Sequence, residues 1–193
     1  IPILFLCLGA LISAALKPKH APVAGCITAC VGCAAMPFFH ALLSLKWSVP
    51  GYAGAFELFF MLPIAVLGIA AAVNSIGYLK GHGAERANFY WFFFNLMLAA
   101  MFAVVTVESP VLFLLAWETM GVASAALVAF NYKSPSSMRA TWIYLVACHA
   151  GAAFLMLMFA ARAAVVPSAT AVFVFAILGF GLKAGFAGLH VWL

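Results

Sequence analysis

Residues 109–131 have the sequence SPVLFLLAWETMGVASAALVAFN, in which Glu118 is the only ionisable side chain. A helix needs about 20 predominantly apolar residues to cross the hydrocarbon core of a bilayer. This segment is long enough, and the Ser109-Pro110 pair is a typical break between two helices. The segment therefore predicts a membrane-spanning helix that carries one carboxyl group in its interior.

The composition of the whole chain indicates an integral membrane protein. Its 193 residues are 68% hydrophobic and only 7% charged, whereas a soluble domain carries about 25% charged residues. The net charge of +5 comes from Lys and Arg residues that are scattered along the connecting segments. They form no basic patch of the kind that binds nucleic acid, so this class of function is excluded.

Outside residues 109–131, further apolar stretches are separated by short segments rich in Pro, Gly, Ser and Lys. The predicted spans, including the first, are 1–16, 21–45, 55–79, 88–107, 109–131, 139–163 and 168–193. The predicted fold is therefore all-α: a polytopic integral membrane bundle of about seven transmembrane helices. Because no connecting segment is long enough to separate domains, residues 1–193 are predicted to form a single transmembrane domain.

The positive charges of the connecting segments predict the orientation of the chain in the membrane. Alternate segments place six of them on one side and two on the other; the larger group is Lys17, Lys19, Lys80, Arg86, Lys133 and Arg139, and the smaller is Lys46 and Arg162. Cytoplasmic loops carry the excess of Lys and Arg. The larger group is therefore predicted to be cytoplasmic, with the N-terminus outside.

Three ionisable side chains are predicted to lie near the centre of the bilayer. With a rise of about 1.5 Å per residue, Glu118 is about 13 Å, His149 about 15 Å and Lys183 about 21 Å from the start of its span. A charge at the bilayer centre costs roughly 2.5–3.5 kcal/mol, so such groups usually face a partner or a wet interior. We expect Glu118 to pair with Lys183, although a protonated Glu118 bonded to neighbouring backbone is the alternative.

Two histidines extend this set. His149 is either a proton relay or a neutral structural residue with one interhelical hydrogen bond. His190 follows Lys183 by two helical turns, and it either extends the relay or marks the cytoplasmic interface. The predicted proton-translocation residues are therefore Glu118, Lys183, His149 and His190.

Glycines cluster around Lys183, at Gly179, Gly181, Gly185 and Gly188. Each glycine weakens a helix interior by about 1 kcal/mol relative to alanine. The cluster predicts a seventh helix that is discontinuous near Lys183, as at many transport sites. The alternative is that the glycines only permit close packing and that Lys183 extends towards the cytoplasm.

The cysteines predict neither a disulfide framework nor a metal site. Cys26, Cys30 and Cys33 have the C-x3-C-x2-C spacing that can hold an iron–sulfur cluster, but the same spacing describes one face of a helix. Small residues on such a face let membrane helices approach closely. We therefore interpret them as packing residues and expect no metal or cofactor in this chain.

At two of these sites the chain resembles a known family, over about residues 70 to 193. The motifs are Phe113-Leu114-Leu115-Ala116-Trp117-Glu118-Thr119-Met120 and Gly179-Phe180-Gly181-Leu182-Lys183-Ala184-Gly185, the latter followed by Leu189-His190-Val191-Trp192-Leu193. They resemble the antiporter-like, proton-translocating membrane subunits of respiratory complex I and its relatives. Together with Ala147-Cys148-His149, these motifs are most similar to those of the membrane subunit of formate hydrogenlyase-type membrane-bound hydrogenases.

The resemblance has two departures from the family pattern. Gly188 stands where the family commonly has a proline, so the break in the helix rests on glycine here. The first three spans match the family poorly. The acidic residue expected before the third span corresponds to Glu57, but the residues on either side of Glu57 differ from those of the family.

The resemblance implies a longer protein of about 14 helices, of which this chain is a fragment. Residues 1–80 would be the peripheral first three helices, and residues 88–193 would begin the first antiporter-like repeat. Iron–sulfur clusters and NiFe or quinone sites are expected only in partner subunits, which would comprise other membrane subunits and a peripheral redox arm. The expected location is a prokaryotic-type inner membrane, with protons and the lipid bilayer as the other partners.

The function predicted from these features is proton translocation within a multisubunit redox complex, through the buried Glu118 and Lys183 and a central polar axis. No redox catalysis is expected in this chain itself. One alternative is a cation/proton antiporter subunit of the Mrp type. Another is a structural membrane anchor for redox subunits, in which Glu118 and Lys183 move nothing.

Overall fold

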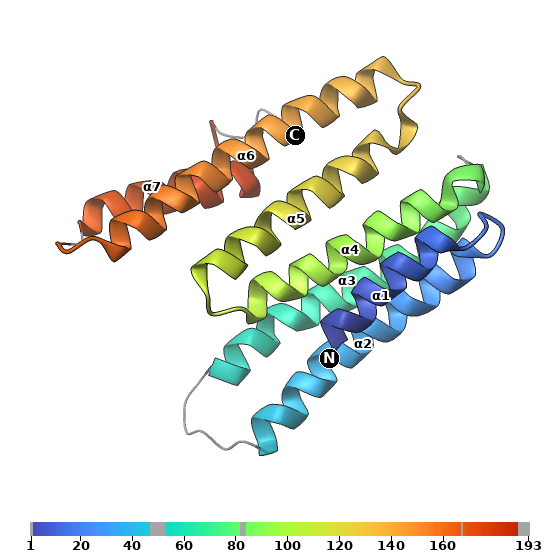
Figure 1. Cartoon of the computed structure of the whole chain (residues 1–193), viewed down its shortest axis with the longest axis horizontal. Coiled ribbons are helices and arrows are strands. Elements are labelled where there is room, and N and C mark those ends of the chain that lie inside the picture. The colour runs from blue at the N-terminus through green and yellow to red at the C-terminus, as the bar shows by residue number, and fades with distance from the viewer. Residues whose placement is uncertain (1, 47–52, 82–83, 167, 189–193) are drawn as a thin grey trace. The chain divides into compact units, whose positions relative to one another are not determined.

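The computed structural model describes residues 2–46, 53–81, 84–166 and 168–188, and these residues are almost entirely helical. This part of the chain contains seven α-helices, which are labelled in Figure 1. They are α1 (Pro2–Ala15), α2 (Ala21–Lys46), α3 (Ala53–Gly81), α4 (Ala87–Thr106), α5 (Pro110–Val128), α6 (Pro135–Ala163) and α7 (Ala169–Ala184). Short 3-10 turns, η1 (Ala84–Arg86) and η2 (Ala129–Asn131), precede α4 and follow α5. The predicted all-α fold is confirmed.

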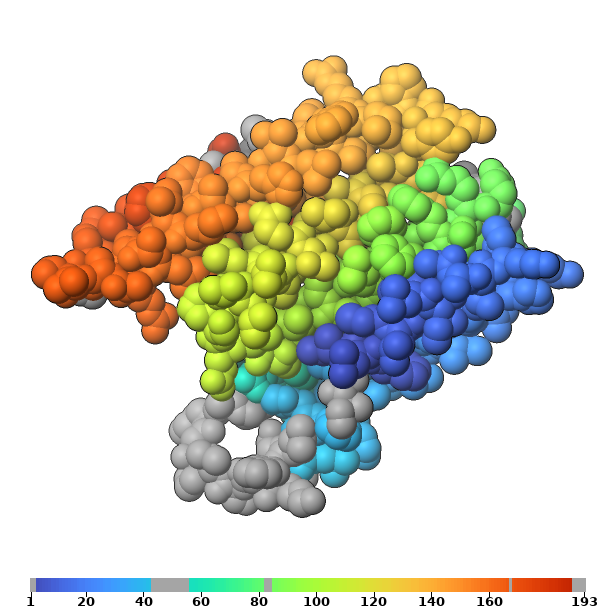
Figure 2. Space-filling view, viewed as in Figure 1, coloured from blue at the N-terminus to red at the C-terminus, as the bar shows by residue number. Residues whose placement is uncertain are grey.

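Five of these helices, α2 to α6, are long and apolar enough to cross a membrane. The apolar helices α1 and α7 are shorter. Their outward surfaces are apolar too; the exposed side chains of α1, dark blue in Figure 2, include Leu4, Leu8 and Leu11. Large exposed apolar side chains of this kind are what a lipid-facing surface requires.

The helix boundaries agree with the sequence-based ones to within a few residues, except for α6 and α7. Helix α6 begins earlier than expected, because Ser134 is its N-cap and Pro135 takes its first position. Helix α7 was expected to extend to residue 193, but it ends at Ala184, where the sequence predicted a discontinuity.

The chain forms two compact units, residues 1–107 and 108–193. In the first, α2 packs on α1, α3 and α4, and α4 also packs on α1 and α3. In the second, α6 packs on both α5 and α7. Helix α6 is therefore the central element of the second unit.

The first unit packs tightly because glycines let large side chains contact helix backbones. A β-carbon on Gly25 would lie 2.4 Å from the Trp91 ring, and one on Gly32 would lie 2.4 Å from Leu6. Trp91 and Leu6 are fully buried. This is the small-residue packing that brings membrane helices together.

A neutral polar network joins α2 to α4 inside the first unit. The amide nitrogen of the fully buried Asn95 donates to the carbonyl oxygens of Gly25, at 3.2 Å, and Trp91, at 3.0 Å. Thr28 Oγ1 lies 3.2 Å from Asn95 Oδ1, to which it donates. Every polar atom of the Asn95 side chain thus has a partner, as an apolar interior demands.

The three cysteines of the C-x3-C-x2-C segment lie on α2 as free thiols. Cys26 and Cys33 are buried, and Cys26 Sγ lies 3.9 Å from Cys30 Sγ. Among the residues that the structure describes, no group of three or more His, Cys, Asp or Glu side chains is arranged to hold a metal ion. The placement of the three cysteines on α2, with Cys26 and Cys33 buried, agrees with their interpretation as packing residues.

Candidate functional site

The candidate site lies in the second unit, around the middle of α6. Glu118 is on α5, about 12 Å from Pro110 and about 15 Å from Val128 along the helix axis. His149 lies at the midpoint of α6, about 21 Å from each end. Glu118 and His149 are therefore far from either end of the helices that carry them.

The structure brings Glu118 and His149 together. Glu118 Oε2 lies 2.8 Å from His149 Nδ1, which is hydrogen-bond distance. The side chains are 34% and 56% exposed within this structure. Such a pair is unstable against lipid chains, so we expect water or further polar protein groups beside it in the membrane.

Lys183 binds to α6 one residue away from His149. Its Nζ donates to Tyr144 OH at 2.8 Å and to Cys148 Sγ at 3.3 Å. The amine also lies 4.9 Å from the centroid of the Tyr144 ring. Tyr144 and Cys148 are one helical turn apart, so both side chains point to the same face of α6.

The direct ion pair expected between Glu118 and Lys183 is not formed in this structure. Within the described part of the second unit, the Glu118 carboxylate is paired with His149, and the Lys183 amine is bound by Tyr144 and Cys148. The cause lies in the packing, because α7 lies along α6 and so presents its lysine to α6 side chains first. The depth of these groups could be predicted from the sequence, but their partners could not.

The amine nevertheless approaches α5 close to Glu118. A β-carbon on Gly121 would lie 3.7 Å from Lys183 Nζ and 3.5 Å from Cys148 Cβ. Gly121 follows Glu118 by three residues, which makes the two positions neighbours on one face of α5. Glu118, His149 and Lys183 thus gather at one level of α6.

The chain direction changes immediately after Lys183. Gly185 has φ 70°, in the left-handed region that favours glycine, and its N–H bonds to the Gly181 carbonyl. The Phe186 N–H donates to the same carbonyl at 3.0 Å, which is the long bond of a Schellman-type ending. Lys183 therefore lies in the last turn of α7, where the helix dipole favours a positive charge.

A second glycine of this cluster has a packing role. A β-carbon on Gly179 would lie 2.6 Å from Leu155 Cδ2 and 3.1 Å from the Gly151 carbonyl oxygen. Gly151 and Gly179 thus let α6 and α7 approach closely, and this contact fixes the level of Lys183 against α6. Gly185 thus ends the helix and Gly179 permits close packing, while the Lys183 amine is bound to α6 side chains.

An aromatic cluster from α5, α6 and α7 lies beside this site. The Trp117 ring stacks on Phe113 at a centroid distance of 5.6 Å and meets Phe180 edge-on at 5.5 Å. Phe113 also contacts Phe159 of α6 at 5.8 Å. Trp117 is adjacent to Glu118, and Phe180 is one turn before Lys183. The cluster therefore packs α5 against α6 and α7 beside the site.

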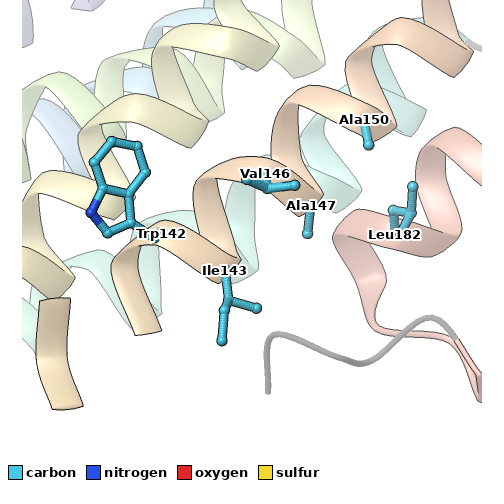
Figure 3. A pocket seen from close by; sticks show the side chains of 6 residues that line it. All are labelled: Trp142, Ile143, Val146, Ala147, Ala150 and Leu182. Carbon is cyan, nitrogen blue, oxygen red and sulfur yellow. The ribbon is translucent and has the colours of Figure 1, made fainter. Parts of the chain in front are cut away.

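An apolar cleft of about 420 Å³ lies between α6 and α7 (Figure 3). Only apolar parts of its lining are exposed; the lining residues are Trp142, Ile143, Val146, Ala147, Ala150 and Leu182. Ala147 and Leu182 precede Cys148 and Lys183 directly. A cleft of this kind offers no chain of hydrogen-bonding groups along which a proton could travel.

Sequence reasoning missed Tyr144 and Cys148 as partners of Lys183. Cys148 is buried. The spacing of Tyr144, Cys148, Gly151 and Leu155 at intervals of three and four residues marks one helical face and could have indicated them. His190, the fourth predicted residue, lies outside the described residues.

Known proteins similar to this chain include a hydrogenase component and a subunit of a NADH-quinone oxidoreductase. Hydrogenase-4 component B of Escherichia coli (strain K12) is 28% identical over 174 residues, which cover 82% of this chain and 25% of that protein. NADH-quinone oxidoreductase subunit L of Mycobacterium tuberculosis (strain ATCC 25618 / H37Rv) is 35% identical over 81 residues, or 42% of this chain and 12% of that subunit. An uncharacterised protein of the same strain is 31% identical over 148 residues, or 70% of this chain and 23% of its own length.

No family model matches the chain. The chain spans a quarter or less of the length of each of these curated relatives. These relatives agree with the resemblance carried by the Trp117-Glu118 and Lys183 motifs. By these matches the chain is a homologue, at modest identity and over part of its length, of the antiporter-like membrane subunits of the complex I family.

Proposed function

We propose that this chain is part of a proton-translocating membrane subunit of a multisubunit redox complex, and that Glu118, His149 and Lys183 carry the proton. One observation carries the proposal. Titratable side chains from three helices lie at one level of α6: Glu118 contacts His149 at 2.8 Å, and Lys183 contacts Cys148, the neighbour of His149 in the chain, at 3.3 Å. The structural alternative, isolated polar residues in separate environments, does not explain this convergence.

The chemistry of the three groups suits proton transfer. A carboxylate and an imidazole 2.8 Å apart can share one proton, and an imidazole gains and loses a proton near neutral pH. Charge interactions are strong in a partly dry interior, so moving one charge changes the proton affinity of the next group. A change at Glu118 would therefore be transmitted to Lys183, whose amine lies beside the same face of α5.

The coupled redox reaction would take place in partner subunits, and this chain would supply only the membrane path. The names of two relatives support this part of the proposal, because one is a hydrogenase component and the other a subunit of a NADH-quinone oxidoreductase. Iron–sulfur clusters and NiFe or quinone sites would accordingly lie in those partners.

The decisive experiment replaces Glu118 by Gln in the full-length protein, within its complex, in sealed membrane vesicles. Redox turnover and proton movement are measured together, the latter with a pH-sensitive dye. Glu118→Gln keeps the shape of the side chain and removes its charge, so proton translocation should fall at least about tenfold. The matched control is Glu108→Gln, which changes an exposed carboxylate just before α5 and should have no effect.

The same vesicles distinguish the two other functions. Sodium-dependent proton exchange by protein that purifies without redox partners would indicate a cation/proton antiporter. Normal proton translocation in a Glu118→Gln, Lys183→Met double variant would indicate a structural anchor and would contradict the proposal.

A further inference from the structure

We propose that Tyr144 and Cys148 are positioning residues that hold the Lys183 amine apart from Glu118. We call these two side chains the amine seat. The inference rests on the proposed function, because it describes how the lysine of that site is held between proton transfers. Its geometry is tested separately below.

The two acceptors of the amine seat are a hydroxyl and a thiol, so neither brings the negative charge that the Glu118 carboxylate would. Tyr144 OH accepts from Lys183 Nζ at 2.8 Å, and Cys148 Sγ accepts at 3.3 Å. Cys148 is buried, and Tyr144 and Lys183 are half-buried. A cation at such a site must be held by hydrogen bonds, since an unsatisfied ammonium is strongly unfavourable in an apolar interior. Tyr144 and Cys148 provide these bonds without the carboxylate.

The backbone on both sides fixes this arrangement. Gly151, one turn after Cys148, contacts Gly179, one turn before Lys183, so closely that a β-carbon on Gly151 would lie 3.0 Å from the Gly179 carbonyl oxygen. Helix α7 then ends at Ala184. Lys183 is therefore presented to Tyr144 and Cys148 by rigid helix packing, and only its side chain needs to move.

The amine also lies beside α5, on the face that carries Glu118. The place of a β-carbon on Gly121 is 3.7 Å from Lys183 Nζ, and Gly121 lies about 4.5 Å along α5 from Glu118. A rotation of the lysine side chain over Gly121 would bring the amine to the carboxylate that His149 now occupies. The lysine would then have two positions, the amine seat and Glu118, which differ in the charge of their acceptors.

The amine seat makes the Cys148 thiol a reporter of where the amine lies. Maleimides alkylate the thiolate form of cysteine, so the rate of labelling depends on the charges in contact with the sulfur. Full-length protein in native membranes is treated with N-ethylmaleimide, and the rate of labelling at Cys148 is measured by peptide mass spectrometry. Cys30 is the internal control, because it lies in the first unit and its recorded neighbour is Cys26 Sγ at 3.9 Å.

Three variants test the position of the amine. Lys183→Met should slow Cys148 labelling at least about fivefold, while Lys183→Arg, which keeps a cation, should change it less than twofold. Glu118→Gln should raise the rate about twofold or more, because the lysine then stays in the amine seat. A Cys148 rate that is unchanged in Lys183→Met would overturn the amine seat, and a rate unchanged in Glu118→Gln would overturn the second position.

A functional test separates positioning from simple packing. Tyr144→Phe removes one of the two acceptors that hold the amine. The pH profile of proton translocation should therefore shift, which a loss of packing alone would not cause. The control is Tyr132→Phe, an exposed tyrosine after η2, which should leave the profile in place.

The outcomes remain distinguishable from those of the proposed function. A Tyr144→Phe variant with reduced proton translocation but an unshifted profile would show a packing role and would contradict the amine seat. Normal proton translocation in Glu118→Gln would instead refute the proposed function, whatever the labelling of Cys148.

Discussion

The two compact units have the same apolar character but use polar side chains in opposite ways. In the first unit, Asn95 is fully buried and its amide is bonded to the backbone oxygens of Gly25 and Trp91. In the second, Glu118, His149 and Lys183 are titratable and remain partly exposed. Polar groups that are neutral and satisfied fix helix packing, whereas partly exposed ionisable groups can change partners.

The spanning helices also differ in how far they are covered. Within the structure, 39% of the most apolar stretch is buried for α2 and α4, 33% for α6, 22% for α3 and 17% for α5. Helix α5, which carries Glu118, is thus the least covered of the spanning helices. This suits a site that must meet water or further polar groups.

A second carboxylate–imidazole pair allows a direct comparison between the units. His40 Nε2 lies 2.7 Å from Glu57 Oε2, between α2 and α3 of the first unit. These residues are only about 6–9 Å from the ends of their helices, whereas Glu118 and His149 are near the middle of theirs. A pair near a helix end can be served by interfacial water, so depth is the property that separates the two pairs.

The largest effect is expected when the two imidazoles are replaced in parallel. His149→Gln keeps a hydrogen-bonding side chain for Glu118 but cannot carry a proton, and proton translocation should fall at least about tenfold. His40→Gln should leave it within twofold of the unchanged protein. Both variants are measured by proton uptake in vesicles at equal redox turnover. Equal losses in the two variants would break the distinction between a conducting pair and a structural pair.

How far the sequence predicted this structure can be seen from particular residues. The apolar runs predicted the helices, because length and hydrophobicity dominate the behaviour of a chain in a bilayer. The helix rise placed Glu118, His149 and Lys183 at one level, and the glycines predicted the break after Lys183. These properties depend on local sequence only.

The partners of the charged groups could not be predicted in the same way. Whether Lys183 meets Glu118 or Tyr144 depends on which helix α7 packs against, and that is set by the close contact of Gly151 with Gly179. The division of the chain between Val107 and Glu108 likewise depends on the contacts that α4 makes with α1, α2 and α3. The predicted assignment of residues 88–193 to a family repeat is a separate matter and stays a prediction.

A matched pair of glycine substitutions should sharpen the difference in packing. A β-carbon at Gly25 would lie 2.4–2.6 Å from Trp91 atoms, so Gly25→Ala should destabilise the protein by about 1–3 kcal/mol. At Gly121 the nearest atoms are 3.5–3.7 Å away, which is ordinary contact, so Gly121→Ala should change stability by less than about 1 kcal/mol. Thermal unfolding in detergent measures both. A larger loss for Gly121→Ala would show that the second unit is the tighter one.

The polar network of the first unit should have a smaller effect. Asn95→Ala removes the hydrogen bonds to Gly25 and Trp91 and leaves Thr28 to bond only to its own helix. Interhelical hydrogen bonds in membranes contribute about 0.6–2 kcal/mol, so a loss of that size is expected in the same unfolding assay. Proton translocation by the folded fraction should stay within twofold. A tenfold loss there would mean that this network belongs to the proton path.

The smallest effect is expected from the cysteines of α2, and it completes the contrast with Cys148. Cys26 and Cys30 contact one another through their sulfur atoms at 3.9 Å and are interpreted as packing residues. Alanine at both positions should change stability by less than about 1 kcal/mol, since small side chains still fit this face. Proton translocation and the iron content of the purified protein should be the same as before. A loss of iron in this double variant would instead make the C-x3-C-x2-C segment a metal site, and the first unit would then carry chemistry of its own.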